Sequence, residues 1–148
     1  MNLSNSFTLA ELTVTKPGIA NVPTTAQIEA LRHLCETVLQ PVRDHFGPVS
    51  IHVGFRSPAL NSAVGGAATS QHLGAVDGDA AADFHVSGHT VEEVVAWMRA
   101  ALLPCDQVIA ETRSGHAPFT WVHASVGKRN RREYLQSVDG KHYAPWAG

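Results

Sequence analysis

Apolar residues recur every three or four positions from residue 24 onward, which is the pattern of an amphipathic helix. Thr24 and Gln27 have the spacing of a capping box, so we expect the helix to begin at this pair. Pro41 falls late in the pattern and has no backbone N–H to donate. The helix is therefore expected to kink or restart there. Gly47 is expected to end it.

A second helix is predicted between Thr90 and Pro104, because Thr90 and Glu93 repeat the capping-box spacing ahead of another helical apolar pattern. Short runs rich in apolar residues, one of them strictly alternating with polar residues, predict strands. These strands are 49–54, 83–86, 107–111 and 120–125. The last two are joined by a polar loop, which suits a hairpin.

The remaining segments are expected to be loops or arms. Residues 1–23 read as an N-terminal arm in which Phe7, Leu9 and Leu12 pack a short helical turn onto the core. Residues 56–69 read as a loop with one short helix, and the pattern assigns no element to the C-terminal tail, 127–148. The 148 residues fit a single domain. Two main helices beside a small, mostly antiparallel sheet make an α+β domain.

Composition excludes several classes of function. The formal net charge is −2, so the chain has no basic footprint for nucleic acid or for an anionic membrane. The short basic run 128–132 is interpreted as a surface segment. No apolar run reaches transmembrane length, so membrane insertion is not expected. The N-terminus lacks the basic start and apolar stretch of a signal peptide, and we expect synthesis in the cytoplasm. Cys35 and Cys105 are interpreted as buried free thiols, although the sequence leaves a disulfide open.

Two stretches carry residues suited to a metal. In the first, His72 leads through a glycine-containing loop to three aspartates, Asp77, Asp79 and Asp83. In the second, His123 lies inside a predicted strand. Two imidazoles and one carboxylate suit Zn²⁺, and three protein ligands leave the fourth position open for water, as in catalytic sites. Bound zinc lowers the pKa of that water to about 7. The spacing alone does not define the site, because no pair has the i, i+4 placement of helical zinc motifs.

Several motifs, in order along the chain, resemble the peptidase M15 family. They are similar in particular to its zinc D-alanyl-D-alanine carboxypeptidase-like domains, which are common in bacteriophages and bacteria. The motifs are Phe7-Thr8-Leu9-Ala10-Glu11-Leu12, Gly54-Phe55-Arg56-Ser57-Pro58-Ala59-Leu60-Asn61, Val64-Gly65-Gly66, Ser70-Gln71-His72, Asp106-Gln107-Val108-Ile109 and Trp121-Val122-His123. The resemblance implies a small α+β fold related to the zinc-containing hedgehog signalling domain. It also implies hydrolysis of peptide bonds in bacterial cell-wall peptides.

Carried over by motif, His72 is the first zinc ligand and His123 the last. Arg56 binds and polarises the substrate carbonyl or carboxylate, a task that suits a permanently charged guanidinium with two parallel donors. The family's spacing of six residues between histidine and aspartate leads to Asp79. Asp83, however, has the expected alanine two residues before it and an apolar residue directly after it. We therefore interpret the loop as lengthened and predict Asp83 as the ligand, with Asp79 as the alternative.

A second departure concerns the general base. Many relatives carry an acid three residues before the last histidine, but this chain has Thr120 there. Glu111 ends the strand 107–111 and would approach His123 if the two strands form a hairpin, so Glu111 is our candidate base. The alternative is a solvated acid at a strand end. Ser70 and Gln107 are expected to add hydrogen bonds near the site.

The leading hypothesis is a zinc metallopeptidase that cleaves peptidoglycan stem peptides or D-Ala-D-Ala-type peptides. It would be either a D,D-carboxypeptidase or an endolysin-like endopeptidase that reaches the cell wall during phage lysis. One alternative is a non-catalytic phage structural or binding module that keeps the fold, which the missing acid at Thr120 favours. Another is a cytoplasmic hydrolase of small D-amino-acid dipeptides. The sequence leaves open which peptide bond is cleaved and the oligomeric state.

Overall fold

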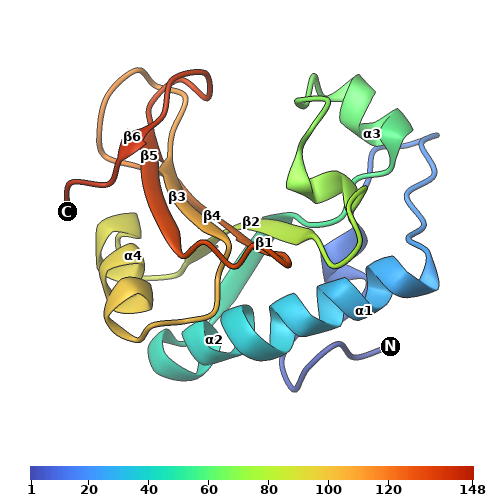
Figure 1. Cartoon of the computed structure of the whole chain (residues 1–148), viewed down its shortest axis with the longest axis horizontal. Helices are drawn as coiled ribbons and strands as arrows, with labels where there is room; N and C mark the ends of the chain where they lie inside the picture. The colour runs from blue at the N-terminus through green and yellow to red at the C-terminus, as the bar shows by residue number, and fades with distance from the viewer.

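A six-stranded sheet forms the centre of the computed structural model, which describes residues 1–148. The strands lie in the order β1-β2-β4-β3-β5-β6. Their bounds are β1 Val49–Val53, β2 Ala80–Val86, β3 Gln107–Glu111, β4 Trp121–Val126, β5 Glu133–Ser137 and β6 Ala144–Pro145. Helices α1 (Thr25–Leu34), α2 (Gln40–Phe46) and α4 (Val91–Ala100) cover one face, while α3 (Pro58–Ala63) lies apart from them (Figure 1). The other face of the sheet is left free for polar side chains.

The long N-terminal helical pattern forms as predicted, with one irregularity. The Thr24 and Gln27 capping box is present, and α1 begins directly after it. Between α1 and α2 the chain makes a π-helical turn, Cys35–Leu39, after which Pro41 lies in the first turn of α2, where a missing N–H costs no hydrogen bond. Gly47 ends α2 with a positive φ of 107°. The helix is thus irregular just before Pro41, through a π turn, but the backbone remains helical and does not break and restart there.

The α+β class is confirmed, but the expectation of a mostly antiparallel sheet is corrected, since the sheet is mixed. β1–β2, β2–β4 and β4–β3 pair in antiparallel fashion, whereas β3 and β5 are parallel. β4 lies between β2 and β3 and has no free edge, so β5, which follows β4 and runs antiparallel to it, pairs with the free edge of β3. β6 then pairs with β5. Both strands come from the tail, 127–148, to which the sequence pattern assigned no element.

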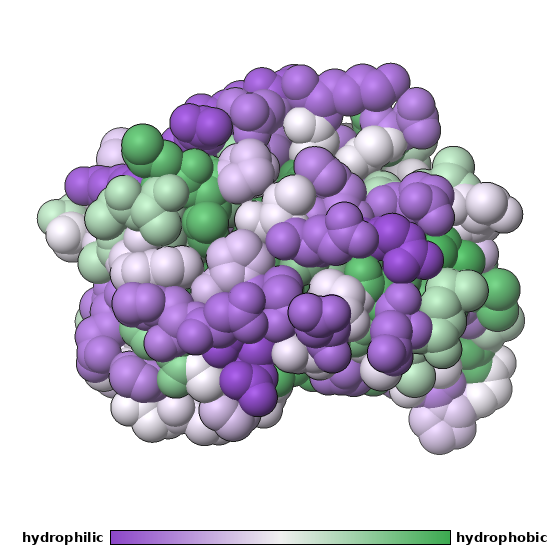
Figure 2. Space-filling model, turned by 90° about the horizontal axis from the view of Figure 1, so that it is seen from below, coloured by the Kyte–Doolittle hydropathy of each residue, from purple (hydrophilic) through white to green (hydrophobic).

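One hydrophobic core lies between the sheet and the helices α1, α2 and α4. The N-terminal segment contributes to it as expected, because Phe7 and Leu12 are buried and a 3₁₀ turn spans Glu11–Thr13. Cys35 and Cys105 are buried free thiols, and burial raises the pKa of each to about 12. Seen from below, the surface is largely hydrophilic with separate hydrophobic patches (Figure 2). None of the helices has the length and apolar character needed to cross a bilayer.

Candidate metal centre

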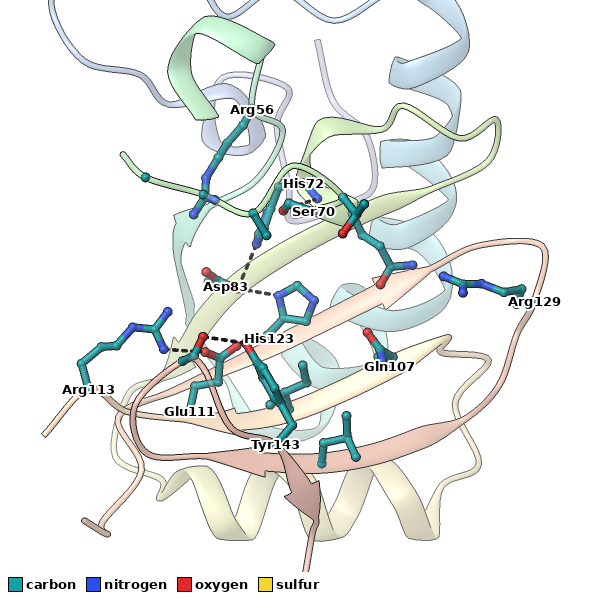
Figure 3. Close-up of a pocket in the computed structure, with 18 residues that line it drawn as sticks. Arg56, Ser70, His72, Asp83, Gln107, Glu111, Arg113, His123, Arg129 and Tyr143 are labelled. Atoms are coloured by element: carbon teal, nitrogen blue, oxygen red, sulfur yellow. Dashed lines mark hydrogen bonds and ion pairs between the residues drawn. The ribbon is translucent and has the colours of Figure 1, made fainter. Parts of the chain in front are cut away.

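His72, Asp83 and His123 meet on the face of the sheet that the helices leave free (Figure 3). Their ligand atoms all lie within 4.8 Å of one another. Asp83 of β2 and His123 of β4 are direct cross-strand partners, which places their side chains next to each other on one face. His72 arrives from a 3₁₀ turn, Gln71–Leu73. The register of two strands and one short turn therefore assembles the cluster.

The hydrogen bonds of His72 fix which of its nitrogens faces the cluster. Nδ1 lies 2.7 Å from the carbonyl oxygen of Gly54, which can only accept, so Nδ1 carries the proton. Nε2 then faces Oδ1 of Asp83 at 3.2 Å, and Nδ1 of His123 lies 2.9 Å from the same oxygen. Three potential metal-ligand atoms thus converge. A metal cation satisfies all of them at once, and a backbone carbonyl that orients a metal-binding histidine is a usual arrangement.

The charges of the cluster favour the anionic form of Asp83, whereas His123 has to lose its proton before it can bind a metal. Burial by itself raises the pKa of Asp83, but the adjacent His72 and His123 outweigh burial and lower it well below its usual range. Burial likewise disfavours a charged His123, yet its hydrogen bond to Asp83 raises its pKa overall. Asp83 is therefore an anion, as a carboxylate ligand must be.

Asp79 lies outside the cluster. It precedes β2, is buried, and packs against Gly127, where any side chain would collide with its carboxylate. Burial raises its pKa, and the nearby charge of Arg129 opposes this effect. Asp77 is exposed and pairs with Lys128 at 3.1 Å. Of the three aspartates in the loop, the structure brings only Asp83 to the histidines.

A cavity of about 440 Å³ opens above the cluster. Arg56 lines it, with Nη1 of Arg56 placed 3.3 Å from Oδ1 of Asn61. Gly66 allows this position, because a Cβ there would collide with the Asn61 side chain and press on the Arg56 guanidinium. The Arg56 backbone N–H also donates to the carbonyl oxygen of His72 at 2.8 Å. This hydrogen bond fixes the backbone of Arg56 beside that of His72.

Glu111 lines the same cavity from the end of β3. The predicted hairpin forms, because β3 and β4 are antiparallel and Glu111 is opposite Trp121. Its carboxylate is buried and accepts a hydrogen bond from Arg113 at 3.1 Å. Burial raises the pKa of Glu111, while His123 and Arg113 counteract that effect and Asp83 adds to it. The structure thus brings Glu111 to the site that contains His123.

Of the other residues that the sequence analysis considered for the site, two line the cavity and one does not. Ser70 and Gln107 line the cavity; Oγ of Ser70 accepts from the His72 backbone N–H at 3.3 Å, and Gln107 donates to Glu133. Thr120 is not among the lining residues, and its hydroxyl donates to the Glu111 carbonyl oxygen.

Sequence reasoning missed three lining residues with functional side chains, Arg113, Arg129 and Tyr143. Arg113 had a weak signal, since it lies two residues after Glu111. Tyr143 had none, because it comes from the tail, to which the pattern assigned no element.

Comparison with known proteins bears on most of this chain. The family model of Peptidase M15 matches residues 5–122, which includes Arg56, His72, Asp83 and Glu111 and ends one residue before His123. A search of curated proteins gave no match. The match extends over far more than half of the 148 residues. The chain therefore belongs to the Peptidase M15 family and is a peptidase-family domain with a His-Asp-His cluster that could hold a metal.

Proposed function

We propose that this protein is a zinc-dependent peptidase that hydrolyses peptide bonds in bacterial cell-wall stem peptides. The observation that carries the proposal is the convergence of His72, Asp83 and His123 inside a cavity that also contains Glu111 and Arg56. Two imidazole nitrogens and one carboxylate oxygen match the ligand set of catalytic zinc sites. When bound, zinc supplies Lewis-acid chemistry, polarising a carbonyl and making a water nucleophilic at neutral pH.

Glu111 is proposed as the general base and acid. A water oxygen bonds to the scissile carbonyl carbon while Glu111 takes a proton from that water. As the C–N bond breaks, Glu111 returns the proton to the leaving amine. Burial raises the pKa of Glu111, which makes its carboxylate a better proton acceptor.

Arg56 is proposed to bind the substrate carbonyl oxygen. Its guanidinium lines the cavity, is always charged and has only one side-chain hydrogen bond, to Asn61, so it has donors left for a ligand. Negative charge that develops on the carbonyl oxygen is stabilised by such a donor.

The substrate and setting rest on the family membership and on the motifs. We propose D-Ala-D-Ala-type or cross-linking stem peptides as substrates, cleaved as a D,D-carboxypeptidase or as an endolysin-like endopeptidase released during phage lysis. A fold related to the zinc-containing hedgehog domain is part of the same proposal. Free D-amino-acid dipeptides are the third candidate substrate class, which a preference for dipeptide over cell wall would reveal.

Hydrolysis of purified muropeptides and of D-Ala-D-Ala peptides by the zinc-loaded chain tests this function. Glu111→Gln should lower kcat by about 10²- to 10⁴-fold, the usual contribution of a positioned acid–base group, and should keep the bound zinc. Glu36→Gln, on the exposed side of the helical segment, is the matched control and should leave kcat unchanged. Loss of zinc in Glu111→Gln would make this residue structural.

A non-catalytic module is the second candidate, and Thr120, in place of an acid, is the observation that favours it. It predicts a chain that binds zinc and stem peptides but hydrolyses neither muropeptides nor dipeptides. A zinc-loaded wild-type chain that is inert toward all three substrate classes would establish that alternative and refute the peptidase.

A further inference from the structure

The β5–β6 hairpin forms one wall of the cavity. Leu135, Gly140 and Tyr143 of this hairpin all line it. Tyr143 lies on the opposite side from Arg56 and Ser70 (Figure 3). This wall lies beyond residue 122, where the match to the family ends. The family match therefore assigns no role to the residues of this wall.

The loop that carries Tyr143 is held by several internal hydrogen bonds. Oδ1 of Asp139 accepts the backbone N–H of Lys141 at 2.8 Å and that of His142 at 2.9 Å. The Gly140 N–H donates to Oγ of Ser137 at 2.9 Å. Directly after Tyr143, β6 pairs with β5. The tyrosine is thus held between a hydrogen-bonded turn and a strand.

The same loop contacts the residue that pairs with Glu111. Gly140 has a φ of 72° and packs on the Arg113 guanidinium, so that a Cβ at this position would collide with Arg113. Arg113 in turn donates to Glu111. A side chain at Gly140 would therefore displace both the loop and the arginine. The position of Tyr143 is consequently linked to that of the proposed base.

The Tyr143 ring reaches from the start of β6 toward Glu111 and His123 (Figure 3). Its hydroxyl donates to the carbonyl oxygen of Gly140, in its own loop, at 3.2 Å. Burial raises the pKa of Tyr143, and the carboxylates of Glu111 and Asp83 raise it further, so the phenol keeps its proton. Tyr143 as a residue is 49 % exposed and lines the cavity, so a ligand there can reach its side chain.

We propose that Tyr143 is a further catalytic residue, whose hydroxyl donates a hydrogen bond to the carbonyl oxygen of the scissile peptide as that oxygen becomes negative. The inference rests on the proposed peptidase function. The new C–O bond moves the carbonyl π electrons onto the oxygen, and the C–N bond then breaks. The proton of the attacking water passes through Glu111 to the amine. Tyr143 keeps its own proton throughout and exchanges only one acceptor, Gly140, for another.

The substitution Tyr143→Phe removes this hydroxyl and nothing else, and Tyr134→Phe is a matched control. Tyr134 lies on the helix-covered face, near Arg99, and does not line the cavity. Tyr143→Phe should lower kcat by about 100-fold, as loss of one oxyanion donor does. KM and bound zinc should change by less than about twofold. Tyr134→Phe should leave kcat unchanged.

A phosphinate analogue of the peptide bond, which imitates the tetrahedral oxyanion, supplies a second measurement. Tyr143→Phe should weaken phosphinate binding by a factor close to its loss in kcat, while product peptide binds as before. An unchanged kcat, or a change confined to KM, would refute the inference and leave the peptidase function standing. If the wild-type chain hydrolyses nothing, the proposed function fails. Equal phosphinate affinity in wild type and Tyr143→Phe would then also refute the role of Tyr143.

Discussion

At the scale of single residues, Asp106 holds the segment of the first histidine to the C-terminal part of the chain. Asp106 is fully buried and accepts from Nε and Nη2 of Arg131, both at 2.9 Å. It also accepts from Nε2 of Gln71 at 2.8 Å. Because Gln71 directly precedes His72, one carboxylate joins the 3₁₀ turn of the candidate metal centre to the chain that enters β5. The resemblance pointed to this aspartate without indicating its contacts.

Replacing Asp106 with Asn should lower stability in a pH-dependent way. The hydrogen bonds from Arg131 hold the pKa of Asp106 well below its usual range, despite burial. Its folded-state pKa is thus below its unfolded-state pKa, so its stabilisation is present above about pH 4 and is lost as the pH falls further. Urea unfolding should show a loss of about 2 kcal/mol at pH 7 for Asp106→Asn, shrinking toward zero in acid.

The control for that measurement is Asp77→Asn, which removes a pair between two exposed side chains, Asp77 and Lys128. Such pairs contribute about 0 to 1 kcal/mol, so its unfolding curve should stay near that of the wild type. A loss for Asp106→Asn that is the same at every pH would contradict the ionic explanation.

At the scale of elements, the sequence predicted the helices and strands that have a clear capping motif or a clear apolar pattern. Both capping boxes, one short helix within residues 56–69 and the β3–β4 hairpin appear as the pattern predicted. β5 and β6 were missed because β5 shows no clear alternation and β6 is only two residues long. Their pairing depends on the free edge of β3, which no local pattern reveals.

The same distinction applies to the candidate site. His72, His123 and Arg56 have motif signals, and the structure places all three around one cavity. Which aspartate joins them depends on where β2 begins and on its register with β4, because Asp83 faces His123 only through that pairing. Local sequence therefore left Asp79 and Asp83 as alternatives.

The capping box of α4 offers a test at this scale. Oγ1 of Thr90 accepts the Glu93 backbone N–H at 3.1 Å, and Glu93 accepts in return from Thr90. Thr90→Ala should destabilise the chain by about 1 kcal/mol because it removes that acceptor. Thr90→Ser should stay close to wild type in thermal unfolding. Equal losses in both variants would show that the methyl group, and not the cap, matters.

At the scale of the whole molecule, the tail completes both the sheet and the site. β5 covers the edge of β3, and Trp146 is buried in the core. A chain cut after Val126 should therefore lose cooperative unfolding by calorimetry, since β3 becomes an uncovered edge and Asp106 loses Arg131. A chain cut after Gly140 should keep β5 and Arg131 but lose Tyr143. A fully cooperative transition for the shorter chain would contradict this account.

The identity of the carboxylate that joins His72 and His123 decides the composition of the metal centre. Zinc per chain, measured by elemental analysis and by titration, tests it in wild type, Asp83→Ala and Asp79→Ala, with thermal unfolding as a check on folding. We predict about one bound zinc per chain for both the wild type and Asp79→Ala. Asp83→Ala should lose at least tenfold in zinc affinity, because removing a direct ligand costs at least as much as removing a supporting partner. Full zinc binding by Asp83→Ala together with loss of zinc from a folded Asp79→Ala would contradict Asp83 as the ligand.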